Sequence, residues 1–441
     1  MFKKILPIFF SAIFVLTGCF STVAIDAKAN EKSVWTMDSG VKIITATDLH
    51  FISPRIMDKG ASIMKVTEKG DGKVTHYTPE ITNAFIEEVI DQKPDFLVLT
   101  GDLTYNGELA SHEDLASKLK KVEESGIKVS VIPGNHDIRI PFAYSFEGEK
   151  AYYTDSVTDE EFKNLYKDFG YDESTMKDPG SFSYVTELND GLWLVMIDVN
   201  TADSPDTMST STTKWLNEVI DSATKKGIKL ISSTHQNLLT HNNRIVDGYK
   251  VNNSEEALNI LQRGKTYINL SGHIHVQDVS DNDTGMIEID TGSMAVADNS
   301  YAVIQISKDD DFKYYTKMID VAGFAKKLGS QDANLLDFQN YSSQFFLKTS
   351  VNRTIKQLLN QDIDIPDEEL DKMTEIAARL NLTYFQGRGD TVSKDIKNEE
   401  GYKLWEKYGQ GLRTLEYMND IINGRVKNEN IFEVNFKSLY K

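Results

Sequence analysis

Cysteine is almost absent from this chain, because Cys19 is the single cysteine in 441 residues. One thiol excludes a disulfide within the chain. The folded state must therefore be stabilised by a large apolar core, and a chain of this length can bury one.

Positive charge is also scarce. The chain has 48 lysines and arginines against 67 aspartates and glutamates, which gives a formal net charge of −19. Residues 1–18 contribute only Lys3 and Lys4, so the remainder is more acidic still. Such a surface repels nucleic acid and anionic lipid at long range, which argues against a protein that tracks a polyanion. An anionic small-molecule substrate would need a local positive charge, and a metal cluster supplies one.

An apolar segment near the start of the chain is too short to be taken as a transmembrane span. Residues 5–15 are almost wholly apolar and follow Lys3 and Lys4, which predicts a secretory signal peptide over residues 1–18. The next residues, Leu16-Thr17-Gly18-Cys19, resemble a lipobox, in which the cysteine thiol is alkylated by a diacylglyceryl group before cleavage. A cysteine that stands there by chance is the alternative, and its single occurrence argues against chance.

The lipobox resemblance implies a protein held by a lipid at Cys19 on the extracytoplasmic face of the cell membrane, or released from there. Residues 19–40 show little periodicity and are predicted to be a polar tether. We find no internal repeat and no low-complexity tract in the rest of the chain.

From residue 41 onward, short apolar runs alternate with amphipathic stretches, which is typical of an α/β fold. Strands are predicted at residues 41–46, 95–99, 127–132, 192–197, 228–231 and 267–270. Helices are predicted at residues 78–92, 113–125 and 213–225, and a long polar insertion at 51–76. Three more strands without intervening helices are predicted at 286–289, 302–306 and 312–317. This pattern favours two packed mixed β-sheets flanked by helices, in one domain over residues 41–320.

Beyond residue 320 the pattern predicts helices only, in a C-terminal helical domain over residues 321–441. Apolar side chains recur there at helical spacing in three stripes, which we interpret as core. These stripes are Phe338, Tyr341, Phe345 and Phe346; Leu370, Met373, Ala377 and Leu380; and Tyr402, Trp405, Leu412 and Leu415.

Five of the predicted strands are each followed by residues that can bind a metal ion. These residues are Asp48 and His50, Asp102, Asn135-His136-Asp137, His235, and His273 with His275. Loops at the carboxyl ends of parallel strands are where α/β sheets place their chemistry. Carboxylate oxygen, amide oxygen and imidazole nitrogen suit divalent manganese, iron or zinc. These ligand residues are numerous enough to bind two divalent ions that share one bridging carboxylate. A two-metal site of this kind holds a hydroxide for in-line attack at phosphorus.

In this order the five loops resemble those of the calcineurin-like metallophosphoesterases. The resemblance covers roughly residues 42–317 and implies a four-layer sandwich. It implies that the first ion is bound by Asp48, His50 and His275, that Asp102 bridges, and that the second ion is bound by Asn135, His235 and His273. His136 is then left without a metal, as a proton donor to the leaving oxygen or a charge stabiliser. The alternative is a set of ordinary turn residues and core histidines, which five loops in the family's order make improbable.

The residues around Asp102 indicate which class of phosphoester the substrate belongs to. Gly101-Asp102-Leu103-Thr104-Tyr105-Asn106-Gly107-Glu108 lacks the second Asp and the Arg of the protein Ser/Thr phosphatase branch, and Tyr105 stands in place of that Asp. The run and the helical C-terminal region are similar to cyclic-nucleotide phosphodiesterases instead. A diester carries one charge on its phosphate, so a missing guanidinium costs less.

The resemblance thus implies a phosphodiesterase that hydrolyses cyclic mononucleotides through a metal-bridging hydroxide. A phosphomonoesterase or nucleotidase on the same site is the first alternative, and a binding lipoprotein without turnover is the second. The expected partners are a small-molecule phosphodiester and the membrane that holds the lipid. His112 and His241, close in sequence to ligand residues, could either support the ligands or serve the core.

Overall fold

The computed structural model describes residues 40–282, 285–361, 363–392, 394–424 and 427–439. The predicted signal peptide, Cys19 and all but the last residue of the predicted tether lie outside these ranges. Within them, no helix is both long enough and apolar enough to cross a bilayer.

The first sheet has six strands in the order β14-β13-β12-β1-β2-β3. Its parallel half is β1 (Val41–Ala46), β2 (Phe96–Leu99) and β3 (Lys128–Val131). Its antiparallel half is β12 (Ser300–Ile306), β13 (Asp311–Met318) and β14 (Ile431–Asn435). The three parallel strands end at the same edge, and their following loops carry Asp48, Asp102 and Asn135.

The second sheet also has six strands, in the order β10-β11-β9-β8-β7-β6. Its parallel strands are β7 (Leu192–Ile197), β8 (Lys229–Thr234), β9 (Ile268–Ser271) and β11 (Ile287–Asp290). The antiparallel edge strands are β6 (Tyr184–Asn189) and β10 (Asp278–Asp281). His235 follows β8, and His273 and His275 follow β9.

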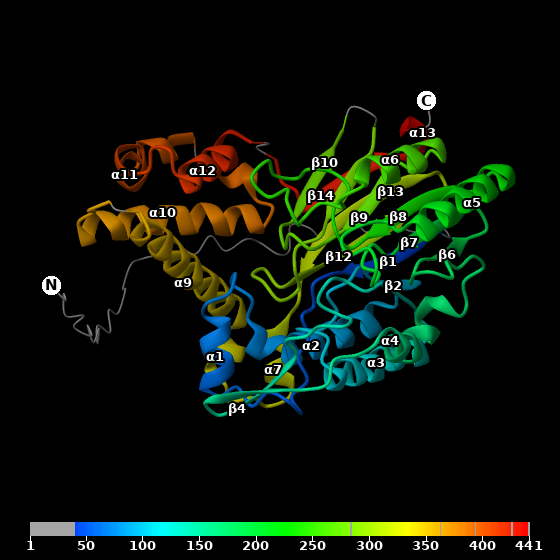
Figure 1. Cartoon of the computed structure of the whole chain (residues 1–441), viewed down its shortest axis with the longest axis horizontal. Helices are drawn as coiled ribbons and strands as arrows, with labels where there is room; N and C mark the ends of the chain where they lie inside the picture. The colour runs from blue at the N-terminus through cyan, green and yellow to red at the C-terminus, as the bar shows by residue number, and fades with distance from the viewer. Residues whose placement is uncertain (1–39, 283–284, 362, 393, 425–426, 440–441) are drawn as a thin grey trace. The chain divides into compact units, whose positions relative to one another are not determined.

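Four layers follow from the way the strands alternate their side chains. In β1, Ile43 belongs to the apolar cluster between the two sheets, whereas the adjacent Ile44 belongs to the cluster under the helices. Helices α2 (Thr78–Gln92) and α3 (Leu109–Glu124) cover the first sheet, and α5 (Thr210–Lys226) and α6 (Ser254–Arg263) cover the second (Figure 1). The expected four-layer α/β sandwich is confirmed.

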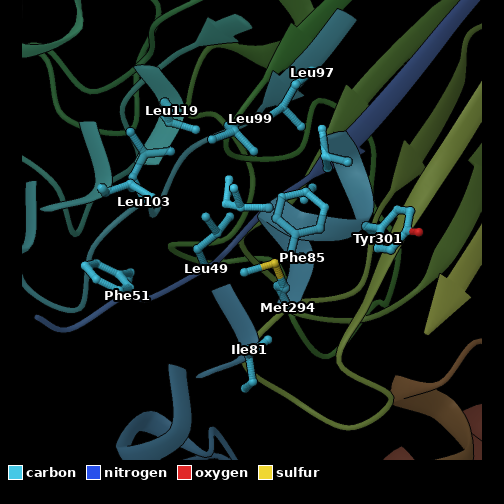
Figure 2. Packing of buried hydrophobic residues seen from close by; sticks show 14 of the residues in the cluster. Leu49, Phe51, Ile81, Phe85, Leu97, Leu99, Leu103, Leu119, Met294 and Tyr301 are labelled. Carbon is cyan, nitrogen blue, oxygen red and sulfur yellow. The ribbon is translucent and has the colours of Figure 1, made fainter. Parts of the chain in front are cut away.

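The core under the first sheet also anchors the loops that carry candidate ligands. Leu49 stands between Asp48 and His50, and Leu103 follows Asp102; both leucines are at most 1% exposed. Figure 2 shows these two side chains among the buried residues contributed by β2 and α2. Burying the apolar neighbour fixes the loop and turns the flanking polar side chains away from the core.

Several elements were not predicted from the sequence. The insertion at 51–76 contains helix α1 (Ala61–Thr67), and β4 (Tyr144–Glu147) with β5 (Lys150–Tyr153) forms a separate hairpin. Helices α4 (Asp159–Tyr166) and α6, and the edge strands β6 and β10, were also missed.

The C-terminal region is helical over most of its length, and the residues of the three predicted stripes are buried except Tyr341, Leu370 and Leu412, which are half-buried. Its helices include α7 (Val321–Lys327), α8 (Ala333–Leu336), α9 (Phe338–Leu359), α10 (Asp367–Phe385), α11 (Glu400–Tyr408) and α12 (Arg413–Asn423). Met373, Leu380 and Trp405 belong to a core of α10 to α12, whereas Phe338 and Phe345 extend the core under the first sheet.

The prediction that this region has helices only was wrong. Strand β14 pairs antiparallel with β13, with Phe312 opposite Val434, and so completes the first sheet. Its five residues are mostly half-exposed, so the apolar alternation that would identify a strand from the sequence is weak.

Candidate metal centre

The loops at the carboxyl ends of the strands bring the candidate ligands together in a strained backbone. Five candidate ligands have a left-handed backbone conformation. Residues other than glycine adopt this conformation at an energetic cost. The φ angles of these candidate ligands are 50° for Asp48, 43° for His50, 46° for Asp102, 74° for His273 and 63° for His275. Repetition of this strain at one site indicates that the loops are shaped to aim side chains.

Glycines allow these loops to approach one another closely. A Cβ added at Gly134 would lie 2.2 Å from Oδ1 of Asp102, and one added at Gly272 would lie 2.0 Å from Oγ1 of Thr47. No side chain fits in either space. These two glycines therefore permit loops from both sheets to converge on Asp48 and Asp102.

One cluster of ligand atoms comprises Asp48, His50, Asp102 and His275, whose atoms lie within 4.8 Å of one another. Oδ1 of Asp48 is 3.2 Å from Nε2 of His275, and Oδ2 of Asp102 is 3.7 Å from Nε2 of His50. All four residues are buried. This is the set that the family resemblance implies for the first ion, together with the bridging carboxylate.

A second cluster comprises Asp102, His235 and His273. Oδ1 of Asp102 is 3.2 Å from Nε2 of His235, and the same nitrogen is 3.2 Å from Oδ1 of Asn135. The two carboxylate oxygens of Asp102 thus face different clusters, Oδ2 the first and Oδ1 the second. This geometry suits a carboxylate shared by two ions.

Hydrogen bonds on the far side of each ring fix which nitrogen keeps a lone pair. Nδ1 of His235 is 2.9 Å from the carbonyl oxygen of Thr100, and Nε2 of His273 is 2.9 Å from that of Gly248. A carbonyl only accepts, so these nitrogens carry the proton and the other nitrogen of each ring can bind a metal.

The first cluster contains contacts that a cation would satisfy. Nε2 of His50 and Nε2 of His275 lie 3.1 Å apart, and Oδ1 of Asp48 is buried without a hydrogen-bond partner. Two nitrogen lone pairs and a carboxylate oxygen repel one another unless a proton or a metal ion lies between them. The donor set therefore fits divalent ions, and the two clusters together can hold a dinuclear metal site.

The electrostatics of the clusters agree with this fit. Burial opposes charge on His235 and His275, but Asp102 raises the pKa of His235 to about 10, and Asp48 raises the pKa of His275 to about 9. Burial alone would raise the pKa of Asp48 and of Asp102, yet these imidazoles hold both below the usual range. The carboxylates thus attract positive charge strongly, and metal ions can replace the protons.

His136 lies beside the first cluster without belonging to either. Its ring centroid is 5.1 Å from that of His50, and its Nδ1 is 3.0 Å from the carbonyl oxygen of Tyr105 and 2.9 Å from Oδ1 of Asn106. The ring of His136 is thus held by an amide oxygen and a backbone carbonyl oxygen rather than by a carboxylate. Burial lowers the pKa of His136 despite the nearby charge of Asp102. Nε2 remains as the nitrogen available to a substrate.

His112 and His241, whose roles the sequence left open, lie outside both clusters. His112 is a core residue, with Nδ1 2.9 Å from the hydroxyl of Tyr166 and Nε2 2.8 Å from the carbonyl oxygen of Asp137. His241 is buried between Asp278, at 2.7 Å, and Glu288, at 3.2 Å.

Comparison with protein families agrees with the geometry. The family model described as calcineurin-like phosphoesterase matches residues 41–277, which is more than half of the chain. The chain belongs to this family. The model described as the C-terminal domain of cyclic nucleotide phosphodiesterase matches residues 320–428. The protein is therefore a metal-dependent phosphoesterase with a helical C-terminal region of the cyclic nucleotide phosphodiesterase type.

Three solved structures are similar to parts of this phosphoesterase. A dimetal phosphatase from Danio rerio is 12% identical over 63% of this chain and 95% of that one, with a TM-score of 0.45. The purple acid phosphatase PPD1 from yellow lupin is 14% identical over 64% and 52%, with a TM-score of 0.43. GAP50 of Plasmodium is 13% identical over 63% and 84%, with a TM-score of 0.38. Comparison with curated proteins gave no match.

Two carboxylates that support the phosphoesterase site were not identified from the sequence. Asp71, in the polar insertion, accepts a hydrogen bond from Nδ1 of His275 at 3.0 Å. Asp137, which the sequence groups with Asn135 and His136 among the residues that can bind a metal ion, belongs to neither cluster. It accepts hydrogen bonds from the backbone nitrogens of Leu103, Thr104 and Gly134, and so ties the loop after β2 to the loop after β3.

Substitution of Asp137 by alanine should destabilise the phosphoesterase strongly. The carboxylate is fully buried and also accepts a hydrogen bond from the hydroxyl of Thr104. Its removal therefore leaves four donors without their acceptor. At about 1–3 kcal/mol for each unsatisfied buried donor, with partial relaxation, we expect a loss of at least about 3 kcal/mol. Urea unfolding of Asp137→Ala and wild type measures it, and a loss below about 1 kcal/mol would refute the assigned role.

Proposed function

We propose that this phosphoesterase hydrolyses phosphodiesters and that cyclic mononucleotides are its substrates. The observation that carries the proposal is the match of residues 320–428 to the C-terminal domain of cyclic nucleotide phosphodiesterase, on the same chain as the buried ligand clusters. The contacts of His136 also support it. Its Nδ1 is held by the amide oxygen of Asn106 and the carbonyl oxygen of Tyr105, and the aspartate of the protein Ser/Thr phosphatase branch is replaced by Tyr105.

The cofactors in this proposal are two divalent ions, chosen among manganese, iron and zinc. Carboxylate, amide and imidazole donors suit all three metals. When bound, such ions supply Lewis acidity toward the phosphoryl group. Asp48, His50 and His275 would hold the first, and Asn135, His235 and His273 the second, with Asp102 between them.

His136 acts on the leaving oxygen in this proposal. Its Nδ1 proton is held by two oxygen acceptors, so the ring cannot turn away. In the imidazolium form, which the charge of Asp102 favours, Nε2 carries the second proton, toward the substrate. Opening a cyclic nucleotide releases a ribose alkoxide, which is a poor leaving group and benefits from that proton. The backbone nitrogen of His136 also donates to Oδ1 of Asp102 at 2.8 Å, which fixes the histidine relative to the shared carboxylate.

A comparison of matched substrates tests the proposal. The metal-depleted protein is loaded with manganese, iron or zinc in turn and assayed on a cyclic mononucleotide and on the nucleoside monophosphate that its hydrolysis yields. We expect the cyclic diester to be hydrolysed with a kcat/KM at least about tenfold higher, a transition-state difference of about 1.4 kcal/mol. Preference for the monoester with every metal would show a phosphomonoesterase or nucleotidase instead.

We propose further that a lipid on Cys19 anchors the phosphoesterase at the extracytoplasmic face of the membrane. The motif Leu16-Thr17-Gly18-Cys19 supports this location. We expect Cys19→Ser to yield an unprocessed or soluble protein with unchanged specific activity, because a single lipid provides attachment and has no part in catalysis. Fractionation of cells followed by intact-mass measurement checks this. A processed Cys19→Ser protein that remains in the membrane fraction would contradict it.

A further inference from the structure

A short segment of the polar insertion lies against the metal centre. Residues 70–77 connect α1 to α2, and Oδ2 of Asp71 lies 3.0 Å from Nδ1 of His275. Nζ of Lys73 lies 3.7 Å from the same carboxylate oxygen, with the lysine side chain only 17% exposed. Asp71 and His275 are separated by 204 residues in the sequence, so their contact depends on the tertiary fold.

The C-terminal helical region holds this segment in place. A Cβ added at Gly72, whose φ is +98°, would lie 2.4 Å from the ring of Phe346 in α9, so the backbone passes directly over that buried ring. Nε2 of His76 lies 2.7 Å from the hydroxyl of Tyr341, also in α9. The nitrogen of Val74 donates to the carbonyl oxygen of Ala295 at 2.9 Å. The segment is thus fixed at Gly72, between Asp71 and Lys73, and at Val74 and His76, just after them.

The Asp71 carboxylate determines which nitrogen of His275 faces the ligand cluster. A carboxylate only accepts, so Nδ1 carries the proton and Nε2 keeps its lone pair toward Oδ1 of Asp48, 3.2 Å away. A carboxylate behind a histidine also makes the imidazole a stronger ligand, and its loss typically lowers metal affinity about 10–100-fold. Lys73 balances the charge of Asp71 at the same carboxylate oxygen that His275 contacts.

We propose that Asp71 is a positioning residue for His275, and that α9 holds Asp71 there so that the helical C-terminal region completes the metal centre. This inference rests on the proposed two-metal site but on no particular substrate. The helical region then contributes to catalysis through the bound ions and needs no contact with the substrate.

Metal binding without substrate tests the inference. Metal-depleted full-length protein is titrated with Mn²⁺ by calorimetry, in the wild type and in Asp71→Asn, which keeps the size of the side chain but removes its charge. We expect one of the two dissociation constants to rise about 10–100-fold and the other to change less than about threefold. Phe346→Ala, which removes the ring under Gly72, should shift the same constant in the same direction by a smaller factor.

The chain provides a matched control in Asp278→Asn. Asp278 accepts from Nδ1 of His241 at 2.7 Å, a similar buried carboxylate–histidine pair, and neither residue belongs to a ligand cluster. This variant should keep both dissociation constants. Wild-type metal affinity in Asp71→Asn, or an equal loss in Asp278→Asn, would overturn the inference. A wild type that binds two ions but hydrolyses no cyclic nucleotide would instead refute the proposed function and leave this inference standing.

Discussion

Asp102→Asn should abolish hydrolysis and reduce the metal content at both positions. Its two carboxylate oxygens face different clusters, Oδ1 toward His235 and Oδ2 toward His50. An amide presents one oxygen and a neutral charge, so it can serve at most one ion. We expect kcat/KM to fall by at least about 10³-fold, as for residues whose loss dismantles a catalytic unit.

Elemental analysis of the purified variant measures the metal, and Asp198→Asn provides the control. Asp198 also closes a strand, β7, and is buried, but it bonds to the backbone nitrogens of Phe182 and Asn200 and belongs to neither cluster. The control should retain the wild-type metal content. Two full equivalents of metal in an active Asp102→Asn protein would show that Asp102 does not bridge.

His136→Ala should separate metal binding from chemistry. The imidazole belongs to neither ligand cluster, so both ions should remain bound. Activity on a cyclic mononucleotide should fall about 10²–10⁴-fold, the usual contribution of a positioned acid. A bis-nitrophenyl diester has a leaving group that needs no proton, so its hydrolysis should fall much less.

The ratio of the two losses identifies the role of His136. Equal losses on both substrates would indicate that the imidazole stabilises charge on the phosphate, and a loss of metal would identify it as a ligand. Asn106→Ala is the matched milder variant, because it removes one of the two acceptors at Nδ1, 2.9 Å away, and leaves the imidazole in place. Its substrate ratio should shift in the same direction as that of His136→Ala by a smaller factor.

The strands and the ligand loops could be predicted because their signals are local. Each candidate ligand follows an apolar run within a few residues, so the carboxyl end of the strand indicates where the side chain lies. The structure accordingly brings Asp48 and His275 together although they belong to different sheets. Their roles as ligands remain predictions that the Asp102 and Asp71 variants address.

The supporting residues could not be predicted, because their partners are distant in the sequence. Asp71 lies in a polar insertion and resembles an ordinary turn residue until the fold places it beside His275. Strand β14 was missed because pairing with β13, rather than a strong apolar alternation of its own, makes it a strand. Burial of Asp137 likewise depends on two loops that meet only in the folded chain.

A stepwise metal titration tests the central claim, that two ions in one site hydrolyse a cyclic phosphodiester. Metal-depleted protein receives Mn²⁺ in fractions of an equivalent, and hydrolysis of a cyclic mononucleotide is measured at each step. We predict little activity up to one equivalent and a rise to the full rate as the second equivalent binds. Full activity at one equivalent, or hydrolysis that does not depend on added metal, would contradict the two-metal account.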